Sequence, residues 1–69
     1  MGVLVKRSFT LTGHRTSVAL ENEFWQVLET IASERRRTMV SLVAEVDAAR
    51  GPERPLASAL RVFALTQRH

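Results

Sequence analysis

A short stretch of strict alternation constrains this chain more than any other feature of its sequence. Residues 15–20 read Arg-Thr-Ser-Val-Ala-Leu. Successive side chains of a strand point to opposite faces, so an extended conformation puts Arg15, Ser17 and Ala19 on one face. The opposite face then carries the more apolar set, which is Thr16, Val18 and Leu20. A lone strand is unstable in water because its backbone groups need partners and its apolar face needs a cover. The stretch therefore predicts a paired strand with one buried face.

The partner of this strand has two candidates. The first is a second copy of the chain, because a chain of 69 residues without Cys builds only a marginal core and has no disulfide to support it. The second is the stretch 6–11, which also alternates, with Lys6, Ser8 and Thr10 opposite to Arg7, Phe9 and Leu11. Thr12, Gly13 and His14 have the length and the glycine of a tight connection. Residues 6–20 therefore form either a hairpin or one long interrupted ribbon.

An amphipathic helix is predicted from about Asn22 to Arg36. Its apolar residues recur at helical spacing and are Phe24, Leu28, Ile31 and Ala32, with Trp25 and Val27 at the flanks. The acidic first turn favours the positive end of the helix dipole. A turn between helices commonly places Gly in the left-handed conformation, but here Arg36 would take that position at a cost of roughly 1 kcal/mol.

Two further helices are predicted after this turn. Thr38 is the expected N-cap of a helix that runs to about Arg50, because its hydroxyl can accept from the backbone N–H of Val40 or Ser41. Residues 51–55 contain Gly and two Pro and form a linker. Residues 56–69 form a C-terminal helix with few polar positions, expected to be buried against a partner chain or another dimer. Within it, Arg61 is expected to pair with Glu45 or Asp47.

Charge is segregated along the chain. The net charge is +3, residues 1–20 hold three bases and no acid, and residues 21–34 hold four Glu and no base. Arg35, Arg36 and Arg37 follow directly. Two explanations remain open: a basic surface for nucleic acid, or arginines that complement the negative end of the preceding helix.

Catalytic and metal-binding patterns are sparse. The two histidines, His14 and His69, stand far apart in the sequence, and there is no Cys, so neither a metal site nor a cofactor is expected. No serine belongs to a recognisable nucleophile motif and no glycine-rich phosphate loop is present, so an enzyme is not expected. No stretch resembles a targeting or membrane-spanning segment, which favours a cytoplasmic protein.

The predicted order of strand, helix, capped turn and helix resembles the ribbon-helix-helix proteins, a family of dimeric DNA binders that includes the Arc and methionine repressors. The similarity is closest to a small bacterial family of such domains. The matching segments are Lys6-Arg7-Ser8, Gly13 to Ser17, Leu20-Glu21 with Phe24-Trp25, Leu42 to Arg50, and Ser58 to Phe63. The resemblance divides the chain into an N-terminal arm or extra strand (1–14), a ribbon-helix-helix core (15–50), a linker (51–55) and a C-terminal helix (56–69).

The resemblance implies a mainly α fold with a short β-ribbon, in an intertwined homodimer whose paired strands enter the DNA major groove. It assigns Arg15, Ser17 and Ala19 to base contacts, where Arg15 can donate two hydrogen bonds to guanine and Ala19 offers only a methyl group. It assigns phosphate contacts to the start of the second helix, and the basic side chains of the strand and of the turn before that helix are expected to add further phosphate contacts. These are Thr38, Met39, Val40, Lys6, Arg7, Arg35, Arg36 and Arg37.

The implied dimer core consists of apolar residues of the strand and of the first two helices. Its members are Val18, Leu20, Phe24, Trp25, Leu28, Ile31, Leu42, Val43 and Val46. The function that follows is sequence-preferring binding of double-stranded DNA by a homodimer or tetramer, as in transcription regulation. The alternative is a protein-interaction or oligomerisation module that kept the fold without specific DNA binding.

Overall fold

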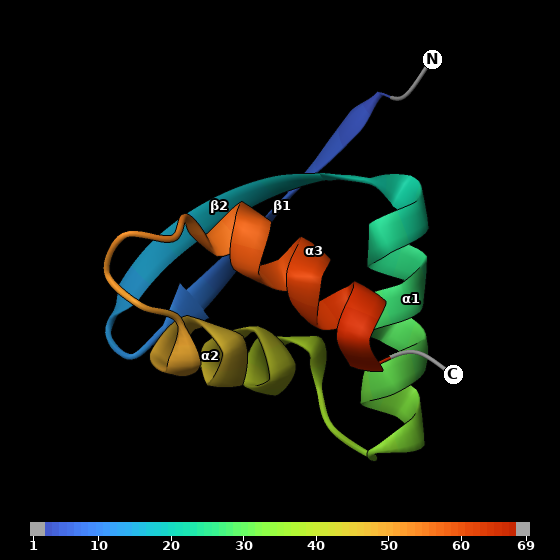
Figure 1. Cartoon of the computed structure of the whole chain (residues 1–69). Helices are drawn as coiled ribbons and strands as arrows, with labels where there is room; N and C mark the ends of the chain where they lie inside the picture. Colours follow the sequence, from blue (N-terminus) through green and yellow to red (C-terminus); the bar gives the residue numbers. More distant parts are fainter. Residues whose placement is uncertain (1–2, 68–69) are drawn as a thin grey trace.

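Two strands precede three helices in the computed structural model, which describes residues 3–67 (Figure 1). Strands β1 (Leu4–Leu11) and β2 (His14–Glu21) form an antiparallel hairpin. The loop consists of Thr12 and Gly13, whose φ angles of 37° and 82° are both positive. Consecutive left-handed residues are typical of the two-residue loops that match the twist of paired strands. Of the two predicted arrangements, the structure has the hairpin, so within the chain β1 is the partner of residues 15–20.

The hairpin has two chemically different faces. Alternation along each strand and the register between them bring six side chains together on the side that we call the outer face: Lys6, Ser8, Thr10, Arg15, Ser17 and Ala19. The opposite, inner face is apolar, and its buried side chains are Phe9, Leu11, Val18 and Leu20. The predicted division of residues 15–20 into two faces is therefore confirmed.

Helix α1 (Asn22–Glu34) follows β2 without a loop. Its end has the predicted unusual turn, because Arg36 adopts a φ of 55°. The N–H of Arg37 donates to the Ala32 carbonyl at 2.8 Å and the N–H of Arg36 to the Ser33 carbonyl at 3.1 Å. These two bonds define a Schellman motif, which satisfies carbonyls that the helix end would leave without partners.

Helix α2 (Met39–Ala49) starts at the predicted cap. The Thr38 hydroxyl accepts a hydrogen bond from the Ser41 N–H at 3.0 Å. Because one of the free N–H groups of the first turn is satisfied in this way, the cap fixes where the helix begins.

Helix α3 (Leu56–Gln67) packs against α1, α2 and β2 of its own chain. Positions 68 and 69 of the predicted C-terminal helix lie outside the described residues. The predicted ion pair of Arg61 was wrong in its partner, since the Arg61 guanidinium binds the Glu21 carboxylate at 3.0 Å. Glu45 is paired with Arg37 instead, and Asp47 with Arg50.

One hydrophobic core lies between the inner face of the hairpin and the three helices. It contains every residue of the predicted dimer core except Phe24, which is half-buried and packs against it. These side chains are thus buried within a single chain. Their role in contacts between two chains stays a prediction.

Candidate nucleic-acid interface

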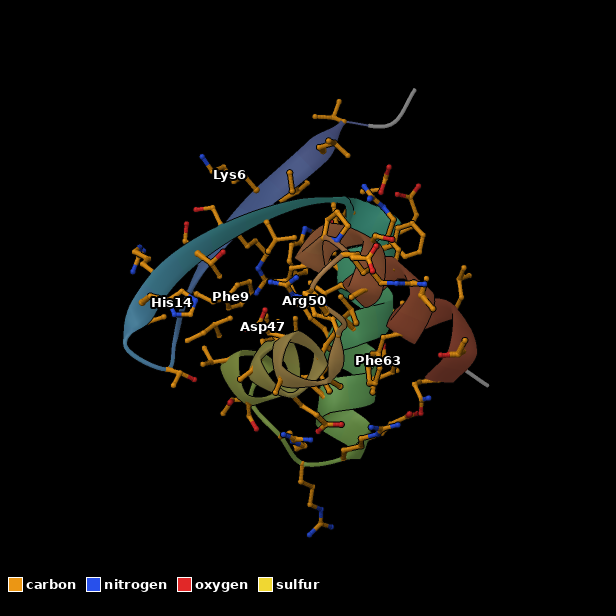
Figure 2. The ribbon with its side chains drawn as sticks, turned by 60° about the vertical axis from the view of Figure 1, so that its left-hand side comes forward. Lys6, Phe9, His14, Asp47, Arg50 and Phe63 are labelled. Carbon is orange, nitrogen blue, oxygen red and sulfur yellow. The ribbon has the colours of Figure 1, made fainter. Side chains whose placement is uncertain are left out.

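The outer face of the hairpin points away from the helices. Figure 2 shows Lys6 projecting outward and Phe9 lying between the ribbon and the helices. All members of the outer face are exposed except Ala19, which is half-buried. The helices cover only the inner face, because that face carries the buried side chains of both strands. A two-stranded ribbon with one free polar face is an element that the DNA major groove can admit.

The centre of the outer face is a pair of serines. Ser8 and Ser17 lie directly opposite each other in the register, and their hydroxyl oxygens are 2.9 Å apart. One hydroxyl donates to the other, so the pair has one remaining proton for a ligand and several free lone pairs. The two serines therefore act as one hydrogen-bonding unit that spans both strands.

Positive charge flanks this serine pair. Lys6 and Arg15 are exposed, and within the described residues neither forms an ion pair. Their charges are consequently available for a negatively charged partner. Lys6 lies opposite Ala19, and Arg15 lies opposite Thr10, so the two cations are on different strands and towards different ends of the ribbon.

Arg7 differs from its neighbour Lys6, because it is on the inner side of the hairpin. Its guanidinium binds the Glu29 carboxylate at 2.9 Å and lies 5.0 Å from the centroid of the Trp25 ring. Trp25 is buried, and its indole N–H donates to the carbonyl of Val5 at 2.8 Å. Arg7 therefore lies on the side predicted from the alternation, and its predicted phosphate contact stays a prediction.

The second group of predicted DNA contacts is at the turn between α1 and α2. Arg35 donates to the side-chain oxygen of Gln67 at 2.6 Å and lies 5.5 Å from the Phe63 ring centroid. Arg37 donates to Ser41 and forms an ion pair with Glu45. Arg36 is exposed, and its side chain has no hydrogen bond or ion pair within residues 3–67. Of the three arginines, Arg36 is therefore the one that is free for an anion.

The start of α2 offers backbone donors beside this turn. The N–H groups of Met39 and Val40 belong to the first helical turn, which has no acceptors within the helix, and the helix dipole is positive there. Thr38 and Val40 are exposed and Met39 is half-buried. The geometry of an anion site at a helix start is thus present, with Thr38 as its cap.

The two groups lie apart in one chain. The turn is at the far end of α1 from the hairpin (Figure 1), and a helix of 13 residues is roughly 20 Å long. The structure therefore places Lys6, Arg15 and Ser17 on the outer face of the hairpin, whereas Thr38 and Arg36 belong to the turn at the other end of α1. It also adds Ser8 and Thr10 to the outer face, which were not among the predicted contacts although their alternation with Phe9 was visible in the sequence.

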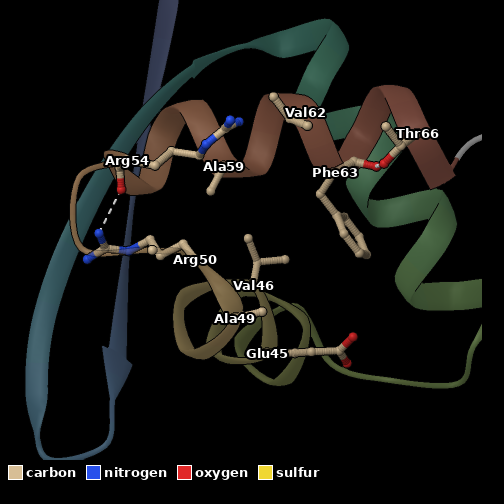
Figure 3. Close-up of a pocket in the computed structure, with 10 residues that line it drawn as sticks. Glu45, Val46, Ala49, Arg50, Arg54, Ala59, Val62, Phe63 and Thr66 are labelled. Atoms are coloured by element: carbon tan, nitrogen blue, oxygen red, sulfur yellow. Dashed lines mark hydrogen bonds between the residues drawn. The ribbon is translucent and has the colours of Figure 1, made fainter.

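An apolar groove that the sequence did not predict lies between α2 and α3 (Figure 3). Its volume is about 330 Å³, and its apolar lining consists of Val46, Ala49, Ala59, Val62 and Phe63. At one end the Arg50 guanidinium donates to the carbonyl oxygen of Arg54 at 2.7 Å. The groove adjoins the buried side of α3, because Ala59 is buried and also lines the groove, and it is open to solvent at the exposed Val62.

Residues 3–67 contain no group of three or more His, Cys, Asp or Glu side chains placed to hold a metal ion. His14 is exposed at the start of β2, and His69 lies outside the described residues. Among the helices described, none has the length and hydropathy needed to cross a membrane.

The chain also matches a known family. A family model described as a ribbon-helix-helix domain matches residues 4–68. The matched region includes both strands and all three helices of the described structure. No curated protein and no solved structure matches the chain.

Proposed function

The chain belongs to the ribbon-helix-helix family, and from this premise we propose that it is a transcription regulator that binds double-stranded DNA with a sequence preference. Proteins of this family are typically DNA-binding transcription regulators. The observation that supports the proposal best is the outer face, where Arg15 and Ser17 are exposed while Val18 and Leu20 anchor the same strand in the core. A rigid support for an exposed polar face is what base recognition needs.

Base contacts in this proposal come from β2. Arg15 offers the forked donors that suit guanine O6 and N7, and Ser17 offers a hydroxyl to either a donor or an acceptor. Ala19 adds an apolar contact that suits a thymine methyl group. Because only Arg15 recognises one base strongly, while Ser17 accepts several, this strand by itself would discriminate moderately between DNA sequences.

Phosphate contacts come from the start of α2 and from free cations. The backbone N–H groups of Met39 and Val40, with Thr38, would bind a phosphate oxygen, and Lys6 and Arg36 would add charge. Arg7, Arg35 and Arg37 have intramolecular partners in the structure. Each would have to exchange that partner for a phosphate, so we expect smaller contributions from these three.

Self-association is part of the proposal. The α2–α3 groove and the exposed Val62 and Leu65 of α3 form an apolar surface that a second copy would cover in a homodimer or tetramer. Two copies would also place two helix starts on the DNA, which compensates for the separation between the hairpin and the α1–α2 turn. The expected location is the bacterial cytoplasm, where the DNA partner is found.

The experiment that tests this function starts from duplexes selected by the protein out of a random pool. Binding of the selected duplex and of an unrelated duplex is then measured for wild type, Arg15→Ala and Arg36→Ala over a range of salt concentrations. Arg15→Ala should lose about 1–3 kcal/mol of binding free energy on the selected duplex only. Arg36→Ala should weaken both duplexes equally and lower the salt slope by about 0.9. Equal losses in the two variants would contradict reading in the groove.

A second candidate function is a protein-interaction or oligomerisation module without specific DNA binding. The apolar groove between α2 and α3 favours it, because a surface of this kind is typical of contacts with other proteins. A mobility shift with genomic DNA fragments at low and moderate salt, beside a measurement of the oligomer mass, distinguishes the two functions. Stable oligomers that shift no DNA at either salt concentration would favour this second function.

A further inference from the structure

We propose that the apolar groove between α2 and α3 is the docking site of a second copy of this chain, whose α3 lies antiparallel across it. The inference deepens the self-association that belongs to the proposed function, because it names the segment of the second copy and its orientation. The edges of the hairpin take no part in it, so this contact adds to any pairing of strands between chains. Three features of the molecule support it: an apolar stripe on α3, a hollow beside the stripe, and the charges at the two ends of the groove.

Helix α3 exposes a narrow apolar stripe. Val62 and Leu65 are 42% and 60% exposed, and the half-buried Ser58 precedes them. Spacings of four and three residues put these side chains on one face of the helix, and the same spacings form the seam by which helices pair in coiled coils. Since the stripe adjoins the apolar groove, the two form one continuous surface. A surface of this kind is typical of a contact with another protein.

The groove beside the stripe provides a hollow for an apolar side chain. Its walls carry small residues, Ala49 on α2 and Ala59 on α3, with Val46 and Phe63 beside them (Figure 3). An alanine on each wall leaves open the space that a larger side chain would fill, and the volume of the groove is about 330 Å³. An exposed leucine from a neighbouring helix is the kind of side chain that such a hole receives.

Two-fold symmetry places Leu65 of the second copy over this hollow. In a two-fold interface the same surface is used by both copies, so two stripes that pair antiparallel meet at their middle residue. That residue is Val62, which then lies against Val62 of the second copy. Leu65 is three positions after Val62, so it lies across from the residue three positions before Val62, which is Ala59. The stripe of each copy therefore fills the hollow of the other.

The charges at the ends of the groove favour this antiparallel orientation. Figure 3 shows Arg50 and Arg54 at one end and Glu45 toward the other. Arg54 is exposed and forms no ion pair within residues 3–67. Glu45 binds Arg37, but its side chain is 42% exposed and its carboxylate has lone pairs for a second donor. An antiparallel copy brings its Glu45 to the end that carries Arg54, whereas a parallel copy would bring two Arg54 side chains together, which like charges oppose.

The test measures the mass of the protein over a range of concentrations by analytical ultracentrifugation. Leu65→Asp should raise the dissociation constant of the assembly at least about tenfold, so that its mass is half that of wild type where wild type is assembled. Thr30→Asp is the control, because it adds the same charge on the exposed side of α1 and should keep the wild-type mass. Arg54→Glu should weaken assembly about three- to tenfold, and combining it with Glu45→Lys should restore most of that loss. Melting temperatures verify that each variant is folded.

A cross-link tests the orientation separately. Val62→Cys introduces a single thiol into a chain without Cys, and oxidation should link two copies because the antiparallel arrangement brings the two positions together. Thr30→Cys should give no link. If Leu65→Asp does not fold, the cross-link decides.

The outcomes separate this inference from the proposed DNA binding. If folded Leu65→Asp keeps the wild-type mass, or if Val62→Cys gives no link, the inference is refuted and the groove is left for an occupant other than this chain. The proposed function still stands in that case, provided that the wild type selects a duplex. If the wild type assembles through position 62 but selects no duplex, the proposed function fails and the interface stands.

Discussion

Lys6 and Arg7 are neighbours in β1 with the same charge, but they lie on opposite sides of the hairpin and have different surroundings. Arg7 lies near the Trp25 ring and binds Glu29, so its charge is used within the fold. Lys6 is exposed on the outer face. The comparison shows that the number of basic residues does not define a DNA-binding surface. The face of the ribbon on which each residue lies decides whether its charge is available to DNA.

The two faces of the hairpin should differ most in how much stability is lost when a side chain is changed, and the largest loss is expected when a buried apolar side chain is truncated. Leu20 is fully buried, so Leu20→Ala should lower the free energy of unfolding by about 2–5 kcal/mol. The adjacent outer-face change Ala19→Ser should stay within about 0.5 kcal/mol of wild type. Urea denaturation of the three proteins measures both values. Similar losses for both variants would mean that the hairpin does not have one buried and one free face.

The loop that sets the register is expected to show the next largest effect. Gly13 has a φ of 82° and Gly51 has no comparable positive φ, while an added Cβ would meet no atom within 4 Å at either position. Gly13→Ala should therefore lose about 1–2 kcal/mol of stability through backbone strain alone. Gly51→Ala should lose little or nothing. Thermal melts of the two variants test whether this loop conformation holds the two faces in place.

The pair Lys6 and Arg7 provides the most direct test of the comparison. Arg7→Ala should reduce stability by about 1 kcal/mol, because it removes a cation–π contact and a partly exposed ion pair. Lys6→Ala should leave stability unchanged and instead lower the salt slope of DNA binding by about 0.9. Denaturation and salt-dependent DNA binding are measured on both variants. If Arg7 were the phosphate contact, Arg7→Ala and not Lys6→Ala would lower the salt slope.

The smallest expected effect concerns Glu21, where β2 passes into α1. Its pKa is lowered, mainly by a hydrogen bond to its own backbone and then by Arg61. A lowered pKa in the folded state means that the ionised carboxylate stabilises the fold above its ordinary pKa, and that this contribution is lost as the pH falls through the lowered value. The free energy of unfolding should therefore be slightly larger for wild type than for Glu21→Gln at neutral pH, and the two values should converge in acid. Glu23→Gln controls for the loss of a charge in the same region, and a difference that persists in acid would contradict the assignment.

Local patterns were sufficient to predict several features of the site. The alternation in residues 15–20 predicted which side chains are exposed, because the period of a strand depends on the backbone alone. Thr38 was identified as a cap from its hydroxyl and its position before an apolar repeat, and the structure confirms the bond to Ser41. The left-handed conformation of Arg36 was also predicted, since the connection between α1 and α2 leaves no glycine for it.

Contacts between distant segments were harder to predict. Arg61 was assigned to Glu45 or Asp47, but it binds Glu21, which is 40 positions away in the sequence. Arg35 likewise reaches Gln67. Such pairs depend on how helices are placed around the core, and the spacing of residues along one helix carries no information about that placement.

The sequence by itself determined the order of strands and helices, their polar and apolar sides, and the residues of the outer strand face, because these follow from short-range periodicity and capping. Only the tertiary structure decided that β1 is the partner of β2, that Arg7 pairs with Glu29, and that α3 covers the core of its own chain. The same apolar surface can be buried by the same chain or by another copy. The choice depends on which segments the connections allow to meet, and in this chain the two-residue loop brings β1 directly beside β2.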